Sequence, residues 1–143
     1  MKRFVAFTII LVSLLTLTMP GLAAGYTKAA FASFLEARFG EELVGYPIFC
    51  EYSDESGFLY YLVLADEPYT DNMINGLHSM AVMIPILWDT LGDGTDLDMK
   101  FSYLDLEGNG FLLVNNSTIT FVEKFEATDT YSIDENGVIE GQP

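Results

Sequence analysis

The chain has 143 residues, of which 21 are acidic and six are Lys or Arg, so its formal net charge at pH 7 is −15. A surface with this much negative charge repels nucleic acid and attracts cations or basic partners. We therefore expect no nucleic-acid partner. A single cysteine, Cys50, excludes an internal disulfide framework, so a hydrophobic core must hold the fold together.

The first 24 residues have the pattern of an export signal. Lys2 and Arg3 precede an apolar run that ends at Pro20, and small residues follow. The run is shorter than the roughly 20 apolar residues of a membrane span. We therefore expect cleavage, a secreted or extracytoplasmic location (periplasm or cell surface), and no membrane contact afterwards; an uncleaved anchor helix is the alternative. Residues 25–143 then form a single domain with four cationic and 21 acidic residues, a net charge of −17.

The first half of this domain predicts a helix followed by a β-hairpin. Phenylalanines and Leu35 recur at helical spacing within Tyr26–Leu43, where Thr27 can cap the start and Gly40 or Gly45 can end the helix. The runs "YPIFCEY" and "FLYYLVLA" flank the turn "SDESG". The second run is apolar almost throughout, which predicts a central position in the sheet.

A second helix is predicted over Tyr69–Gly92. Thr70 can cap it, and Pro85 is expected to kink it or end it early. Its apolar residues recur at helical spacing and predict one buried stripe. The stripe consists of Met73, Leu77, Met80, Ile84, Leu87 and Leu91.

The second half of this helix carries no charge on any face from Met80 to Trp88. A helix that is apolar all round is buried on several sides or covers a partner. We therefore consider an interaction surface on this helix, with burial inside the chain as the alternative. Its candidate residues are Met80, Met83, Ile86 and Trp88.

Strand-like runs follow the second helix. "LDMKFSYLDL", "FLLVN" and "STITFVEKF" predict strands, the last with Ile119, Phe121 and Phe125 on its buried side. Residues 127–143 are expected to form a loosely attached tail or a hairpin that turns at Asn136-Gly137. The order predicts an α+β fold, an antiparallel sheet with two helices on one face. "YTK" and "YTD" before the helices, and "GFL" in both hairpins, suggest a duplicated helix–strand–strand unit; chance recurrence of capping and turn residues is the alternative.

The stretch "DLEGNGF" resembles the first half of a calcium loop. Asp105, Glu107 and Asn109 occupy the first, third and fifth positions, but the twelfth is Asn116, which lacks the two carboxylate oxygens required there. The flanking runs are strand-like rather than helical. The pattern therefore favours a hairpin turn, in which Asn109 and Gly110 tolerate positive φ.

The acidic connection after the second helix offers a second candidate for a cation. Asp93, Asp96 and Asp98 lie on a glycine-containing loop and could supply part of the six to eight oxygens that calcium takes. No fixed ligand spacing supports this site, and a solvated acidic connection is the alternative. We expect no cofactor, with calcium as the alternative.

The residue types favour a noncatalytic function. The chain has one His and one Cys, and Cys50 lies in an apolar strand-like run among acidic residues, where a catalytic thiol is not expected. We expect an exported binding or interaction module whose partner is a protein or a second copy. The alternatives are a cation-binding domain and a small hydrolase that uses scattered carboxylates or Cys50. Asn115 and Asn116 begin two overlapping glycosylation acceptor sequences, and their use depends on the source.

Overall fold

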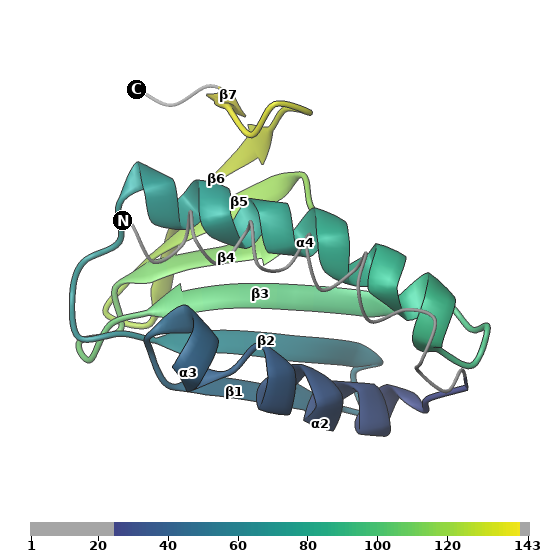
Figure 1. Cartoon of the computed structure of the whole chain (residues 1–143). Coiled ribbons are helices and arrows are strands. Elements are labelled where there is room, and N and C mark those ends of the chain that lie inside the picture. The colour runs from purple at the N-terminus through teal and green to yellow at the C-terminus, as the bar shows by residue number, and fades with distance from the viewer. Residues whose placement is uncertain (1–24, 141–143) are drawn as a thin grey trace.

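A computed structural model of the chain describes residues 25–140; the expected signal and residues 141–143 lie outside this range. The described part is a mixed α+β fold with three helices and one seven-stranded sheet (Figure 1). The helices are α2 (Lys28–Arg38), α3 (Glu41–Val44) and α4 (Asp71–Leu91). The strands are β1 (Ile48–Tyr52), β2 (Phe58–Leu64), β3 (Asp98–Leu104), β4 (Gly110–Val114), β5 (Thr118–Glu123), β6 (Glu126–Ile133) and β7 (Ile139–Glu140).

The strands lie side by side in sequence order from β1 to β7. Neighbouring strands are antiparallel except β2 and β3, which are parallel, with Phe58 beside Asp98 and Leu64 beside Leu104. The α+β class is therefore confirmed, whereas a wholly antiparallel sheet and a count of two helices are wrong. The long connection through α4 allows the parallel pair, because a crossover of this length can return the chain to the same end of the sheet.

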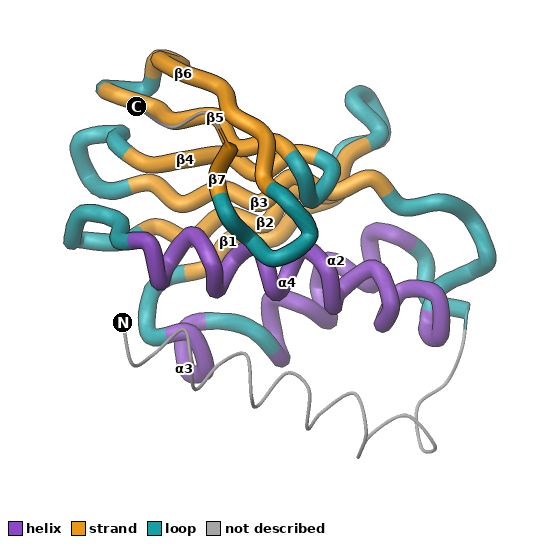
Figure 2. The backbone as a smooth tube through the Cα atoms, turned by 90° about the horizontal axis from the view of Figure 1, so that it is seen from above, coloured by secondary structure: helices purple, strands orange, loops and turns teal. Residues whose placement is uncertain are grey.

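Helices α2 and α4 lie on the same side of the sheet (Figure 2). Their contact includes the rings of Phe31 and Trp88, whose centroids are 5.1 Å apart. This arrangement does not support a duplicated unit. The pairs β1–β2 and β3–β4 follow one another in the sheet, but β1 and β3 run in opposite directions. Superposing β3–β4 on β1–β2 therefore requires turning the sheet over. That rotation would place α4 on the opposite face from α2.

The first predicted helix is divided in two. Thr27 caps α2 by accepting a hydrogen bond from the Ala30 N–H at 3.1 Å, as expected. The helix ends at Phe39, and α3 starts after Gly40 and ends at Gly45, whose φ is +87°. Both glycines that were candidates for the stop therefore mark a helix boundary.

Helix α4 buries the whole predicted stripe but continues through Pro85. The expected early end at Pro85 is therefore wrong. Ile84, Leu87 and Trp88 are buried around the proline, and their burial outweighs the one backbone hydrogen bond that proline cannot make. Thr70 is at the cap position, although its side chain makes no capping hydrogen bond.

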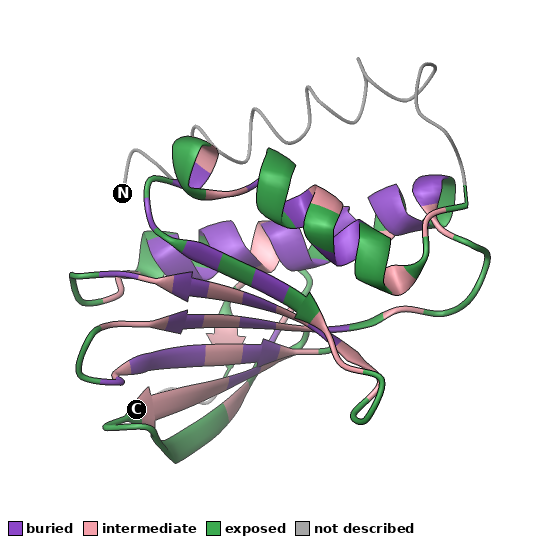
Figure 3. Cartoon of the chain, turned by 90° about the horizontal axis from the view of Figure 1, so that it is seen from below, coloured by how far each residue is buried: buried purple, intermediate pink, exposed green. Residues whose placement is uncertain are grey.

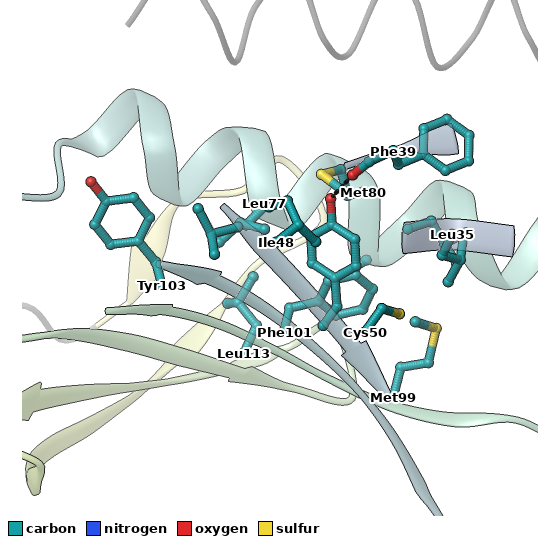
Figure 4. Close-up of a cluster of buried hydrophobic side chains, with 14 of the residues drawn as sticks. Leu35, Phe39, Ile48, Cys50, Leu77, Met80, Met99, Phe101, Tyr103 and Leu113 are labelled. Carbon is teal, nitrogen blue, oxygen red and sulfur yellow. Dashed lines mark hydrogen bonds between the residues drawn. The ribbon is translucent and has the colours of Figure 1, made fainter. Parts of the chain in front are cut away.

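The core lies between the two long helices and the sheet. Its side chains come from alternate positions of β1–β5 and from the inner faces of α2 and α4 (Figure 4). The Tyr61 hydroxyl, deep in this core, donates to the Phe39 carbonyl at 2.6 Å. Along each central strand, buried and half-buried residues alternate, as Figure 3 shows.

The "DLEGNGF" stretch forms the turn between β3 and β4. The Asp105 carboxylate accepts from the N–H groups of Glu107 and Asn109 at 2.8 and 2.9 Å, which fixes the turn. The positive φ falls on Gly108, at +82°, and not on Asn109 or Gly110 as expected. Five residues between the strands make this loop longer than a two-residue turn.

The turn between β5 and β6 packs against this loop. Phe125 lies in that turn with a φ of +67°, and it is 70% exposed. Its N–H donates to the Gly108 carbonyl at 2.9 Å. The assignment of Phe125 to the buried side of a strand is therefore wrong, because β5 ends two residues earlier, at Glu123.

The C-terminal segment is a hairpin of β6 and β7. Strand β6 pairs along β5, and Asp134 closes the turn by accepting from the N–H groups of Asn136 and Val138, both at 2.9 Å. Gly137 has the positive φ that this turn needs, at +81°.

Candidate functional site

The side of the sheet opposite the helices is the most unusual surface of the chain. Among the described residues, no helix lies on this side (Figure 2). Side chains of β1–β4 that point away from the helices are nevertheless mostly apolar, and they are half-buried or exposed. We call this surface the open face. Its apolar residues are Phe49, Phe58, Tyr60, Leu62, Leu64, Leu104, Leu112 and Val114.

The register of the strands makes the open face continuous. Phe49 lies beside Leu62. Leu62 lies beside Ser102, and Ser102 beside Leu112. Phe49 is 55% exposed although it is a large aromatic residue within β1. One row of side chains therefore crosses four strands with a single polar member.

The same side of the sheet becomes polar beyond β4. Its residues there include Thr118 and Thr120 of β5, which lie beside Ser132 and Thr130 of β6. The hydroxyls of Thr120 and Thr130 are 2.9 Å apart and share a hydrogen bond. An antiparallel sheet with one solvated face usually carries polar residues there. Strands β5 and β6 follow this rule except at Val122, which lies beside Gly110, and the departure is concentrated in β1–β4.

The open face has about the width of one helix. Three gaps of about 4.8 Å between four strands give roughly 14 Å, and five residues of about 3.3 Å give roughly 17 Å. The projected area of this rectangle, its polar residues included, is therefore on the order of 240 Å². Patches of a few hundred Å² on a soluble protein are often functional.

Acidic residues flank the open face at both ends of the strands. The parallel register of β2 and β3 brings the β1–β2 turn to the same end as the start of β3, and the end of β2 to the same end as the β3–β4 turn. The first end carries Asp54, Glu55, Asp96 and Asp98. The second end carries Asp66, Asp105 and Glu107, whereas the Glu67 carboxylate accepts from the buried Tyr46 hydroxyl on the helix side.

Cations are scarce around the open face. Of the four cationic residues in the described range, Lys100 lies on the open face itself, with its Nζ 4.2 Å from the centre of the Phe58 ring, and Lys124 lies in the β5–β6 turn, where its N–H donates to the Asn109 side chain of the β3–β4 loop. Since the same range holds 21 acidic residues, at most four carboxylates can each have a cation of their own within the chain. The flanks of the open face therefore carry a strong negative potential.

The helix surface considered from the sequence is largely internal. Met80 and Trp88 are buried in the core, and the Trp88 indole N–H donates to the Thr95 carbonyl at 2.7 Å. Met83 is half-buried, and Ile86 is 52% exposed. Val82, one turn before Ile86, is 43% exposed. Two of the four candidate residues thus stabilise the fold, and the exposed part of α4 is a narrow strip.

The aspartates considered for calcium do not form a cluster. Within residues 25–140, no group of three or more His, Cys, Asp or Glu side chains is placed to hold a metal ion. The Asp93 carboxylate accepts from the Thr95 hydroxyl and N–H at 2.5 and 3.0 Å, and these bonds hold its pKa below the ordinary value. Asp98 belongs to β3. The structure gives Asp93 a role in shaping the loop.

The only cysteine and the only histidine of the chain are held in separate structural roles. Cys50 is buried in β1, and burial, with a smaller effect of Glu36, raises its thiol pKa from 9.0 to about 12. His78 lies on α4, and its Nε2 is 2.9 Å from the Asn116 carbonyl oxygen in the β4–β5 turn. Cys50 therefore remains a neutral thiol, which is a poor nucleophile.

A cavity of about 550 Å³ lies at the ends of β2 and β3 where the chain leaves the sheet. Its acidic lining residues are Glu41, Asp66 and Glu67. The Glu67 carboxylate accepts a hydrogen bond from the Tyr46 hydroxyl, and its backbone carbonyl accepts from Tyr103 at 2.8 Å. The cavity lining includes no histidine, cysteine or cationic residue.

Comparisons with protein-family models, with curated proteins and with solved structures give no match to this chain. Among the residues that the structure describes, no helix combines the length and the apolar character needed to cross a membrane. Functional inference therefore rests on the surfaces of the chain itself.

The sequence of β2 contains a signal for the open face. "FLYYLVLA" is apolar at every position, which is typical of a strand covered on both faces. The described residues cover only one face of the sheet. The apolar residues of β2 that point to the other side therefore lie on the open face. "FLLV" in β4 repeats the pattern.

Proposed function

We propose that this chain is a noncatalytic protein-interaction module that binds its partner through the open face, outside the cytoplasm. The single observation that carries the proposal is the apolar row across β1–β4 beside a polar continuation on β5 and β6. An apolar face that stays in water has no benefit to folding, whereas burial against a partner removes it from water.

The size of the open face indicates how it contributes to binding. Covering about 240 Å² at about 25 cal/mol per Å² gives at most roughly 6 kcal/mol, because part of this area is polar. Association costs about 4–15 kcal/mol in lost translational and rotational freedom. Apolar burial alone therefore supports weak binding at most, and contacts at the acidic flanks must supply the rest.

The test compares two exposed apolar surfaces of the same chain. Residues 25–143 would be immobilised and incubated with exported proteins of the source organism, and bound protein would be quantified by mass spectrometry. The L62S/L112S variant alters the open face, and the V82S/I86S variant alters the exposed strip of α4. The F49S variant has little effect on packing because Phe49 is mostly exposed.

The proposal predicts a partner retained at near one-to-one stoichiometry by the unmodified domain and by V82S/I86S. L62S/L112S and F49S should retain at least about tenfold less, since each removes apolar contact area. Thermal unfolding of each variant checks that the fold persists. Retention that is lost only in V82S/I86S would place the interaction surface on α4 and refute the proposal.

A further inference from the structure

We infer that the open face binds a cationic amphipathic helix of a partner protein, with its apolar stripe along the strands and Lys or Arg near both ends. This inference rests on the proposed function and adds the chemistry of the partner. It follows from the width of the apolar surface, its length and the sign of the charge at its two ends.

The width selects one helix. An α-helix with its side chains is about 10–12 Å across, and the apolar part of the open face is about 14 Å wide. One helix therefore covers it, and two do not fit side by side. A helix on this side would complete a second helical layer, so that the apolar residues of β2 are covered on both faces as their sequence pattern indicates.

The length sets the size of the helix. The seven residues of β3 separate the two acidic ends by about 23 Å, at about 3.3 Å per residue. A helix of about 15 residues has this length, at about 1.5 Å per residue. Cationic side chains in its first and last turns would therefore meet the acidic residues at the two ends of the open face.

The charge at the two ends argues against a second copy as the occupant. Both ends are acidic, so two open faces that met along their strands, in parallel or antiparallel orientation, would place acidic residues against acidic residues. A stable dimer also needs about 800 Å² of buried surface from each copy, well above the apolar area here, so the repelling flanks would have to be included. A cationic helix gains from the same flanks.

The probes for this inference are three synthetic peptides of about 15 residues, the helix length set above. The first has a leucine stripe at helical spacing, with lysines near both ends and beside the stripe. The second has glutamate in place of every lysine. The third has the composition of the first in an order that destroys the stripe. Binding to residues 25–143 would be measured by fluorescence anisotropy at low and high NaCl, and self-association by sedimentation equilibrium.

The striped lysine peptide should bind at least about tenfold more tightly than either other peptide, since it alone combines apolar and charge complementarity. Its affinity should fall at least about tenfold from about 50 to about 500 mM NaCl, because salt screens the flanking charges. L62S/L112S and F49S should weaken it by a similar factor, and V82S/I86S should not.

Three results would overturn the inference. Equal binding of the scrambled peptide would show that charge alone acts. Equal binding of the glutamate peptide would show that the flanks do not select charge. A micromolar dimer that L62S/L112S abolishes would make a second copy the occupant. The proposed function fails separately, when capture of the natural partner is insensitive to the open-face variants.

Discussion

The carboxylate of Glu36 on α2 accepts a hydrogen bond from the backbone N–H of Cys50 on β1, with Oε2 and N 3.0 Å apart. Strand β1 is an edge of the sheet, and Cys50 is in its middle. An edge strand with unpaired N–H groups is a template for pairing with another chain. Glu36 therefore occupies a donor that would otherwise be available to a foreign strand.

Removing this acceptor should destabilise the domain and expose the edge. The E36A variant is expected to lose about 1 kcal/mol in the free energy of unfolding, the typical contribution of one hydrogen bond, and to form oligomers at high concentration. Chemical denaturation and size-exclusion chromatography measure both effects. E36Q is the matched control, since its amide oxygen still accepts. An E36A variant that is monomeric and as stable as E36Q would contradict this role.

Gly110, at the start of β4, allows a close approach to the preceding strand. A Cβ at this position would lie 1.7 Å from the Tyr103 carbonyl oxygen, which belongs to β3 backbone and cannot move alone. We expect G110A to lower the free energy of unfolding by about 3 kcal/mol, because the overlap forces the strands apart.

The control for this substitution is Gly94, whose added Cβ would meet no atom within 4 Å. Its φ is +87°, so G94A carries only the backbone cost of about 1–2 kcal/mol. Urea denaturation of the two variants gives the comparison. A G94A variant that is less stable than G110A would show that the β3–β4 contact is not tight.

The Cys50 thiol should be unreactive in the folded protein. Because burial raises its pKa to about 12, only about one molecule in ten thousand carries a thiolate at about pH 8. Reaction with a disulfide reagent such as DTNB is expected only at the rate of unfolding, and to become rapid in denaturant. Fast modification of the native domain would contradict the burial of Cys50 and revive its candidacy as a nucleophile.

Alkaline pH should lower the free energy of unfolding of the domain. Burial raises the pKa of Cys50 from 9.0 to about 12, and it also raises the pKa of Tyr61 and of Tyr103 above the ordinary value of 10.0. These groups ionise at their ordinary values in the unfolded chain. Their contribution to stability is therefore complete below about pH 9 and decreases above it, by about 1.4 kcal/mol per pH unit for each group.

Urea midpoints at a series of pH values test this expectation. The midpoint should be level between about pH 7 and pH 8.5, fall above about pH 9, and fall more steeply above about pH 10. C50A should remove the part of the decrease that begins at about pH 9. A midpoint that stays constant up to about pH 10.5 would mean that none of the three groups is held neutral by the fold.

Much of the fold could be predicted from local patterns. The stripe from Met73 to Leu91 is buried as expected, Thr27 caps α2, and "SDESG" turns between β1 and β2 with Gly57 at a φ of +76°. These features depend on residues within one element. The parallel pairing of β2 with β3 and the continuation of α4 through Pro85 depend on contacts between elements, which local periodicity does not contain.

The candidate site could likewise be predicted only in the part that depends on a single strand. The apolar outer residues of β2 were visible in the sequence as a strand without polar positions. Their meaning depended on which side of the sheet the helices cover, and alternation within one strand does not supply that information. For the same reason Met80 and Trp88 were candidates for a surface, although the sheet and α2 cover them.

The most direct test of the open face as the binding surface is a methyl NMR titration of residues 25–143 with the captured partner. The account predicts chemical-shift changes at Leu62, Leu64 and Leu112, with Val82 and Ile86 on α4 unchanged. Changes confined to Val82 and Ile86, with the leucines of the open face unaffected, would contradict it.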